Sequence, residues 1–436
     1  MTKTVSEREL VLGILLEITR DGAYSHIVLH HTLNKYQYLD KKERAFITRV
    51  VEGTLEHMIE LDYIINQFSK IKVQKMKPVI RTIIRSAVYQ LKYMDSVPNS
   101  AVCNEAVKLA TKKGFVNLKG FVNGVLRNIE RNLEQVSYPD SSDTIPYLSI
   151  RYSMPEWILQ QWLAVYEKET VVTMLEDFLT EKPTTIRCNL QQITKEDLIR
   201  KLQEEGVTVE EHPMLAYALF ISGYNYLAEL QSFQDGDFQV QDSSSMLVTE
   251  IADPQAGDYV IDVCAAPGGK ALHMAERLAS GGYVEARDLT EYKVSLIEEN
   301  IIRSGRMNIK AVQQDATVWD EASVEKADIV IADLPCSGLG VLGKKTDLKY
   351  KMTETMQAEL VVLQRKILAV VQAYPKEKGV LIYSTCTIHK EENEENVAWF
   401  LKEYPMYELA SMKQMLPGID ASDGFFIAKF RKVNHG

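Results

Sequence analysis

The stretch Val260-Ile261-Asp262-Val263-Cys264-Ala265-Ala266-Pro267-Gly268-Gly269-Lys270 decides how this chain folds. An apolar run ends at Asp262, small residues follow, and a helical pattern begins at Lys270. A strand that passes through glycine into a helix presents backbone N–H groups to a ligand. The stretch lacks G-x-G-x-x-G, and a P-loop would need glycine at Cys264 and serine or threonine at Ala271. We therefore predict a cofactor loop of another kind.

Strands and helices alternate on both sides of this loop. Apolar, β-type runs predict strands at 259–263, 283–287, 309–313, 329–333, 380–384 and 425–430. Helical spacing predicts helices at 270–278, 292–304 and 353–371. This alternation is typical of a doubly wound parallel sheet, in which ligands bind outside the carboxyl ends of the strands.

Aspartate recurs at these strand ends. Asp288 closes the second strand, 20 residues after Gly268, where a carboxylate can accept hydrogen bonds from ribose hydroxyls. Asp315 follows the third strand, where it or its adjoining backbone can recognise an adenine edge, and Asp333 closes the fourth. The predicted cofactor-binding residues are Cys264, Ala265, Ala266, Pro267, Gly268, Gly269, Lys270, Asp288, Asp315 and Asp333.

Two cysteines are placed at the same predicted edge. Cys336 lies in Asp333-Leu334-Pro335-Cys336-Ser337-Gly338, and Cys386 in Ser384-Thr385-Cys386-Thr387, each just after a strand. A nucleotide-like cofactor and two thiols would then share one crevice. The other cysteines, Cys103, Cys188 and Cys264, are interpreted as small buried residues.

The rest of the chain predicts further domains. Residues 1–140 show helical spacing almost throughout, and a turn-rich stretch near residue 140 marks a boundary. Residues 141–235 mix short strands with helices, including one at 195–205 capped by Thr194, and predict a small α+β unit. We expect a catalytic α/β domain over 236–436.

Composition narrows the class of protein. The chain has 436 residues, and its 46% hydrophobic and 25% charged residues are typical of a globular protein. Its five cysteines show no metal-like pairing, so we expect free thiols and no metal site. Without a signal-peptide pattern or a spanning apolar stretch, a cytoplasmic location is expected, with no membrane partner. A monomer is the default.

The net charge of −10 is unevenly distributed. Lys70–Arg131 holds 13 basic and three acidic residues, whereas residues 141–436 carry a net −16. Such asymmetry favours a basic face for a polyanion beside an acidic body, although solvated helix faces would give the same count.

The motifs together resemble the S-adenosylmethionine-dependent RNA cytosine-C5 methyltransferases. The resemblance rests on the loop at 262–270, Gln314-Asp315-Ala316, the two cysteine motifs, Phe238–Ser245 and Ser422–Phe426. Lys41–Ala45, Val97–Val107 and Gly120–Arg127 are similar to the NusB fold. A NusB-like domain ahead of such a catalytic domain, with Lys345–Tyr350 after the cysteine motif, resembles the bacterial 16S ribosomal RNA enzymes. Ala271, Leu334 and Arg287 depart from the usual family pattern.

The resemblance implies a fold and a mechanism. The fold is an all-α NusB-like domain, a small α+β unit and a Rossmann-like methyltransferase domain that binds S-adenosyl-L-methionine. Cys386 would be the nucleophile that adds to carbon 6 of cytosine, Cys336 would assist product release, and Asp333 would supply the acid at ring N3. His389 is expected to contact RNA or nothing, and Glu395–Val397 to be a helix surface.

The expected substrate is 16S ribosomal RNA, naked or in an assembling small subunit. Transfer RNA is the alternative substrate for the same chemistry, and RNA loops offer unstacked bases at low cost. A non-catalytic RNA-binding assembly factor is the alternative from another class. DNA is not expected, because DNA cytosine methyltransferases place their nucleophile in a P-C-Q setting.

Overall fold

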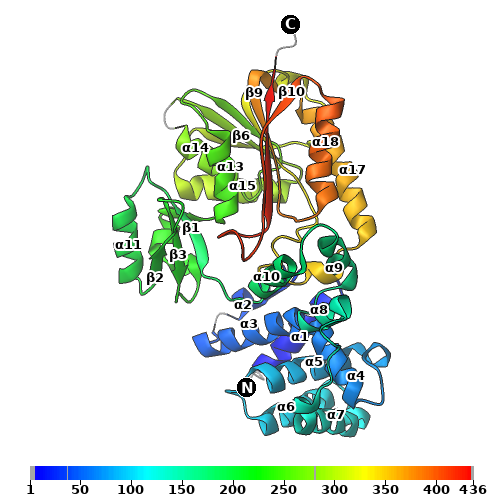
Figure 1. Ribbon diagram of the computed structural model, residues 1–436. Coiled ribbons are helices and arrows are strands. Elements are labelled where there is room, and N and C mark those ends of the chain that lie inside the picture. Colours follow the sequence, from blue (N-terminus) through cyan, green and yellow to red (C-terminus); the bar gives the residue numbers. More distant parts are fainter. Residues whose placement is uncertain (1–4, 37, 279–280, 434–436) are drawn as a thin grey trace. The chain divides into compact units, whose positions relative to one another are not determined.

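The computed structural model describes residues 5–36, 38–278 and 281–433, and the chain divides into two compact units. One unit comprises Met1–Leu179 with Leu342–Lys351, and the other comprises Thr180–Val341 with Met352–Gly436. The first is helical and the second contains both sheets (Figure 1). Within the described ranges, no helix combines the length and apolarity needed to cross a membrane.

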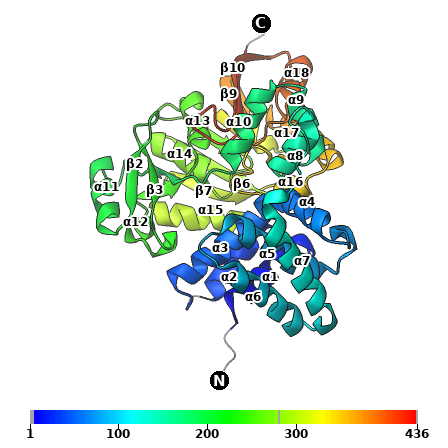
Figure 2. The same cartoon turned by 60° about the horizontal axis from the view of Figure 1, so that its bottom comes forward.

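Ten of the described helices build the first unit from the N-terminal part of the chain (Figure 2). Capping boxes at Ser6 and Asp40 start α1 and α3, and Pro78 occupies the first position of α5. The apolar faces of α1 to α7 meet in one core that runs from Leu10 to Ile129. The bounds are α1 Glu7–Thr19, α2 Ser25–Lys35, α3 Lys41–Glu56, α4 Met58–Phe68, α5 Pro78–Tyr93, α6 Asn99–Lys112, α7 Lys119–Asn132, α8 Thr144–Arg151, α9 Glu156–Leu163 and α10 Lys168–Phe178.

A segment distant in sequence completes this helical unit. Leu342–Lys351, which includes the short helix α16 (Leu348–Lys351), folds with it. Helix α2 has no side-chain cap of its own. Asp347 supplies one, because its carboxylate accepts from the backbone N–H of Ser25 at 3.0 Å and from the Ser25 hydroxyl at 2.6 Å.

The same segment caps the end of α3. Lys349 donates through Nζ to the carbonyl of Glu56 at 3.0 Å, and Tyr350 donates through its hydroxyl to the carbonyl of Leu55 at 2.8 Å. The last carbonyls of a helix lack partners within the helix and favour a nearby cation. The segment that continues the Cys336 loop therefore satisfies two helix ends in the N-terminal unit.

Replacing Asp347 by alanine should loosen α2 by about 2 kcal/mol, because the cap is lost and the buried Ser25 hydroxyl loses its acceptor. Amide hydrogen exchange within α2 should then speed up about 30-fold in the full chain. Lys345, exposed two residues earlier, provides the matched control Lys345→Ala. Wild-type exchange rates in the Asp347→Ala chain would contradict the capping role.

The second unit begins with a four-stranded antiparallel sheet in the order β2-β3-β1-β4. Its strands are β1 Thr184–Cys188, β2 Thr208–Glu211, β3 Ala218–Ser222 and β4 Phe238–Val240, with α11 (Lys195–Glu204) and α12 (Gln231–Gln234) beside them. Thr194 caps α11 by accepting from the backbone N–H of Asp197, as predicted. An α+β unit is confirmed, but α8, α9 and α10, which lie within the predicted bounds of 141–235, belong to the helical unit, and β4 lies just beyond residue 235.

The larger sheet of the second unit has seven strands in the order β10-β11-β9-β8-β5-β6-β7. Its strands are β5 Tyr259–Asp262, β6 Tyr283–Asp288, β7 Ile309–Gln313, β8 Ala327–Asp333, β9 Pro375–Thr385, β10 Tyr407–Met415 and β11 Phe425–Lys432. Its helices are α13 Ser243–Ala252, α14 Gly269–Arg277, α15 Glu291–Ser304, α17 Glu354–Val371 and α18 Glu394–Glu403. Strands β5 to β9 are parallel, which confirms the predicted doubly wound core.

Helices cover both faces of this sheet (Figure 1). Val260, Ile329 and Ile331 pack with residues of α13, α14 and α15. Ile261 and Val330, one residue out of step, pack with residues of α17 and α18 on the opposite face. Because successive strand residues point to opposite faces, a strand buried on both sides is apolar throughout, as these runs are.

The sheet differs from the prediction at one edge. Strand β11 pairs antiparallel with β9, and β10, which was not predicted, pairs antiparallel with β11. A short connection between β10 and β11 can join antiparallel neighbours, whereas parallel neighbours need a crossover. Strand β10 was missed because Glu408–Lys413 is exposed and therefore carries no clear apolar pattern.

Candidate active site

The strand order places several predicted site residues at the carboxyl edge of the seven-stranded sheet. Strand β5 lies between β6 and β8, so the chain winds outward in opposite directions from it. Ligands bind at such a switch point in open α/β sheets. Asp262, Asp288 and Asp333 are the last residues of β5, β6 and β8, and Asp315 follows β7 by two residues.

The predicted cofactor loop connects β5 to α14. Gly268 is the N-cap of α14 with a φ of 106°, a conformation that favours glycine. The carboxylate of Asp288 accepts from the backbone N–H of Ala266 at 3.0 Å and of Leu289 at 2.8 Å. The loop is thereby tied to the end of the next strand. The structure brings Cys264 to Lys270 together with Asp288, as the sequence predicted.

Asp262 is a buried carboxyl at the start of this loop. One oxygen accepts from the backbone N–H of Cys264 at 3.3 Å, while the buried Oδ2 has no hydrogen-bond partner among the described residues. Burial, with the nearby charge of Asp333 adding to it, raises the pKa of Asp262 to about 8. An unpaired buried oxygen is costly, so this atom is suited to a cationic or hydrogen-bond-donating ligand.

Asp315 differs from Asp262 because it has local partners. It accepts from the backbone N–H of Thr317 at 2.8 Å and from the Thr317 hydroxyl at 2.7 Å. These bonds lower the pKa of Asp315. Its carboxylate is therefore held in a turn just beyond β7.

Lys270 and Asp333 form an ion pair at this carboxyl edge. Nζ of Lys270 lies 2.7 Å from Oδ2 of Asp333, and the Ser384 hydroxyl donates to the other oxygen at 2.7 Å. Burial opposes the charge of Lys270, yet the Asp333 carboxylate raises the pKa of Lys270 above its usual range. The charge of Cys386 also favours this ammonium.

The two cysteines meet at this edge. Sγ of Cys336 lies 3.2 Å from Sγ of Cys386, and the backbone N–H of Cys386 donates to Sγ of Cys336 at 3.2 Å. Both residues are partly exposed, whereas Cys103 and Cys188 are buried as predicted. Cys264, predicted to be buried, is also partly exposed.

Two glycines allow a third segment to close on the cysteine loops. Gly340 donates its backbone N–H to the carbonyl of Cys386 at 3.0 Å, and Gly424 donates to the carbonyl of Gly340 at 2.9 Å. A Cβ on Gly340 would collide with the carbonyl of Gly424.

The motif at 422–426 also contacts the motif at 238–245, since the backbone N–H of Asp423 donates to Asp242 at 3.4 Å.

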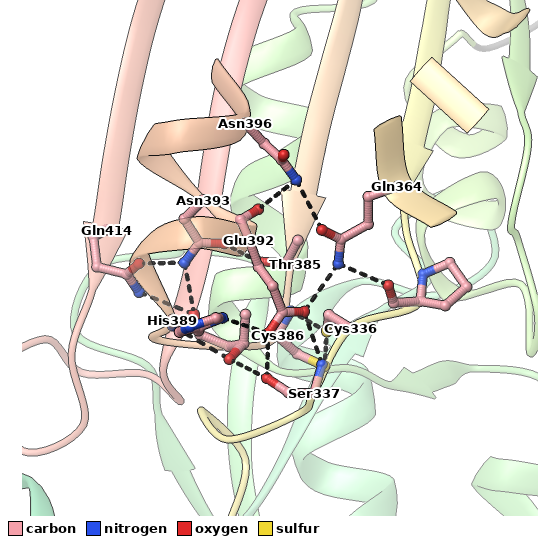
Figure 3. Close-up of polar contacts among 12 residues, drawn as sticks. Cys336, Ser337, Gln364, Thr385, Cys386, His389, Glu392, Asn393, Asn396 and Gln414 are labelled. Atoms are coloured by element: carbon pink, nitrogen blue, oxygen red, sulfur yellow. Dashed lines mark hydrogen bonds and ion pairs between the residues drawn. The ribbon is translucent and has the colours of Figure 1, made fainter. Parts of the chain in front are cut away.

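A buried polar network lies behind the cysteines (Figure 3). Glu392 and Asn396 are fully buried, and His389 is 7% exposed. Nδ1 of His389 lies 3.2 Å from Glu392, and Asn396 donates to Gln364 at 2.8 Å. The prediction for His389 was therefore wrong. The helix surface predicted for Glu395–Val397 is correct for the exposed Glu395 but wrong for Asn396 and Val397, which are buried. Glu392 and Gln364 could not be predicted from the sequence, because their partners lie on elements distant in the chain.

The positions that depart from the family pattern are all buried. Ala271 and Leu334 lie in the apolar cores. Arg287 is 4% exposed and pairs with Glu285 at 2.5 Å and with Asp320 at 3.2 Å. Each departure is thus accommodated by packing or by an ion pair.

The basic stretch of the helical unit is only partly free for a ligand. Ion pairs engage five of its cations, namely Arg85, Lys92, Lys108, Lys112 and Arg127. Lys70, Lys72, Lys75 and Lys77 are exposed around one short turn between α4 and α5. This lysine turn is the densest group of exposed cations in the stretch.

Comparison with known families agrees with each part of this architecture. Residues 249–431 match the family described as 16S rRNA methyltransferase RsmB/F. Residues 5–131 match the NusB family, and residues 154–225 match the ferredoxin-like domain of RsmF/B-like methyltransferases.

Whole-chain relatives extend the comparison. The probable ribosomal RNA small subunit methyltransferase B of Bacillus subtilis is 35% identical over 99% of both chains. The corresponding Synechocystis protein is 31% identical over 98% of this chain and 100% of its own.

Solved structures share the fold. PH0851 superimposes with a TM-score of 0.83 at 24% identity over 98% of both chains. NSun6 from Pyrococcus horikoshii, solved with SFG, gives a TM-score of 0.59 at 24% identity, covering 64% of this chain and 98% of its own.

Proposed function

Because this chain belongs to the family of ribosomal RNA small subunit methyltransferases B, we propose that it methylates carbon 5 of a cytosine in 16S ribosomal RNA. The observation that carries the proposal is the pair of thiols 3.2 Å apart, beside the Lys270–Asp333 ion pair. Carbon 5 of cytosine is a weak nucleophile until a thiolate has added to carbon 6. Two thiols with an acid–base pair supply what that addition and its reversal require.

The charges and hydrogen-bond acceptors at the carboxyl edge of the seven-stranded sheet suit S-adenosyl-L-methionine. This donor carries a cationic sulfonium and an ammonium, and it offers two ribose hydroxyls. The unpaired buried oxygen of Asp262 and the carboxylates around it suit those charges. Asp288 would accept from the ribose hydroxyls, Asp315 or its backbone would recognise adenine, and the loop of Cys264 to Lys270 would surround the rest.

In the addition step, the thiolate of Cys386 forms a bond to carbon 6 while ring N3 receives a proton through Asp333. Asp333 stands as a carboxylate in its ion pair, so this proton comes from the Lys270 ammonium 2.7 Å away, which becomes a neutral amine. The ring then has enamine character, and carbon 5 can take an electrophilic methyl group. S-adenosyl-L-methionine supplies that methyl from its sulfonium.

In the release step, Cys336 gives its proton to Sγ of Cys386 as the bond from carbon 6 to that sulfur breaks, and the resulting Cys336 thiolate takes the proton from carbon 5. The electron pair of the lost proton restores the ring double bond, and the proton on N3 returns through Asp333 to Lys270. Cys336 assists this step from its position 3.2 Å away. Addition and release thus use different thiols.

The proposal is tested by labelled methyl transfer from S-adenosyl-L-methionine. The substrates are unmodified 16S ribosomal RNA, assembling small subunits and transfer RNA, and the product nucleoside is identified by mass spectrometry. We expect 5-methylcytidine in 16S ribosomal RNA, alone or in the assembling subunit. Label confined to transfer RNA would overturn the substrate, and a methyl group elsewhere on the base would overturn the chemistry. Folded protein that binds the donor but transfers nothing would favour an assembly factor.

The lysine turn is proposed to hold RNA phosphates. Replacing Lys70, Lys72, Lys75 and Lys77 by glutamine should weaken 16S ribosomal RNA binding and reduce the slope of log K against log salt by about 3, because each phosphate contact contributes about 0.7–0.9. Fluorescence anisotropy across a salt series measures this slope. The control replaces Lys326 and Lys402, two exposed lysines of the other unit, and should keep the wild-type slope. An unchanged slope in the fourfold variant would refute the role of the turn.

A further inference from the structure

Glu392 is a buried carboxylate that the mechanism above does not use. It ends a short turn at Lys390–Glu392, and it is 0% exposed. A buried carboxylate is costly unless donors surround it. Here the partners are the backbone N–H of Ser337 at 2.9 Å, the Ser337 hydroxyl at 2.5 Å, Nε2 of Gln364 at 2.9 Å and Nδ1 of His389 at 3.2 Å.

These partners hold both chain neighbours of Cys336 (Figure 3). Ser337, which follows Cys336, donates twice to Glu392. Gln364 bridges Glu392 to the residue before Cys336, because its Nε2 also donates to the carbonyl of Pro335 at 2.9 Å. The position of the Cys336 thiol is therefore set from both sides by one carboxylate and its amide partner.

The same carboxylate is linked to the second cysteine loop. The Ser337 hydroxyl lies 2.7 Å from the hydroxyl of Thr387, the residue after Cys386. His389 lies two residues further along that loop and contacts Glu392 directly. Both loops are thus fixed to one buried group, which explains how two thiols 50 residues apart in sequence come within 3.2 Å.

We propose that Glu392 is a positioning residue for product release, which clamps the Cys336 loop against the Cys386 loop. The inference rests on the proposed function and adds a residue to it. A displaced Cys336 would leave addition to carbon 6 possible, because Cys386 keeps its own strand end and Lys270. Release would fail, and the protein would stay bonded to RNA.

Besides positioning the Cys336 loop, the charge of Glu392 helps to keep Cys336 protonated. The hydrogen bond with Cys386 raises the pKa of Cys336 well above its usual range, burial adds to this, and the charge of Glu392 contributes further. Cys336 therefore remains a thiol that can donate to Sγ of Cys386. Loss of that charge would remove one of the contributions that raise the pKa of Cys336.

Glu392→Gln is the informative variant, because it removes the charge and keeps the size. Its amide oxygen can still accept from Ser337 N–H and Gln364, while the Ser337 hydroxyl and His389 can turn to accept from its amide nitrogen. We expect turnover to fall about 10- to 100-fold and the SDS-stable protein–RNA adduct to increase, with KM for RNA little changed. Ser337→Ala removes one of the donors and should give a smaller change in the same direction.

Glu391→Gln is the matched control, since Glu391 is the exposed neighbour in the same turn. It should match wild type in turnover and in adduct. If the wild type is active and Glu392→Gln matches it in turnover and in the amount of adduct, the positioning role of Glu392 is refuted, while the proposed function stands. Equal losses of adduct formation and turnover in Glu392→Gln and Ser337→Ala would also refute it, because they indicate a general structural role. Wild-type protein that leaves 16S ribosomal RNA unmethylated would refute the proposed function as well.

Discussion

Replacing Cys386 by alanine is expected to lower methyl transfer by about 10⁴-fold or more, because removal of a covalent nucleophile leaves only binding and orientation. No SDS-stable protein–RNA adduct should form. Donor binding, measured by calorimetry, should change little, because the cofactor loop belongs to another strand end. Lys270 should keep its pair with Asp333.

Cys103→Ala serves as the control, since it removes a buried thiol from the helical unit and should leave transfer unchanged. A Cys386→Ala protein that retains transfer within about tenfold of wild type would exclude Cys386 as the nucleophile.

Replacing Cys336 by alanine is expected to affect the adduct in the opposite way to replacing Cys386, although the two thiols lie only 3.2 Å apart. Turnover should fall by about 10² to 10⁴-fold, the usual range for loss of a proton-transfer group. The adduct should accumulate, because Cys386 still adds to carbon 6 but release is slow. Gel electrophoresis in SDS with labelled RNA separates the adduct from free protein.

The double variant Cys336→Ala/Cys386→Ala decides where the adduct forms. It should show no adduct, because the nucleophile is gone. An adduct that persists in the double variant, or a Cys336→Ala protein with wild-type turnover and no adduct, would contradict the division of roles between the two thiols.

The strand ends could be predicted because their signals are local. An apolar run closed by Asp262 or Asp333 records burial on both faces of a strand and the polar edge that follows it. The residues of the predicted cofactor loop are consecutive, so their proximity could be predicted without the order of the strands in the sheet. The cysteines were placed on the same reasoning.

The polar interior could not be predicted in the same way. Four acidic residues follow Lys390 within five positions, and composition does not tell which is buried. Glu392 is buried because it meets Ser337, 55 residues earlier in the chain. His389 and Asn396 were misjudged for this reason, since their partners lie on other elements.

Distance in sequence also concealed how Leu342–Lys351 joins the helical unit. Asp347 caps α2 through Ser25, 322 residues away, and no local pattern predicts such a cap. Charge counting likewise overestimated the basic surface, because Arg85 and Lys92 are neutralised by Asp62 and Glu60. Only the fold separates structural cations from those that remain available.

The most direct test of the account is to locate the covalent bond. Fluorine at carbon 5 of the target cytosine cannot leave as a proton, so 16S ribosomal RNA made with 5-fluorocytidine should arrest the reaction after methyl transfer. Digestion and mass spectrometry then identify the peptide that carries the nucleotide. The account predicts the bond at Cys386 in the stretch Ser384-Thr385-Cys386-Thr387. A bond at Cys336, or methylation of normal RNA with no bond to either cysteine, would contradict it.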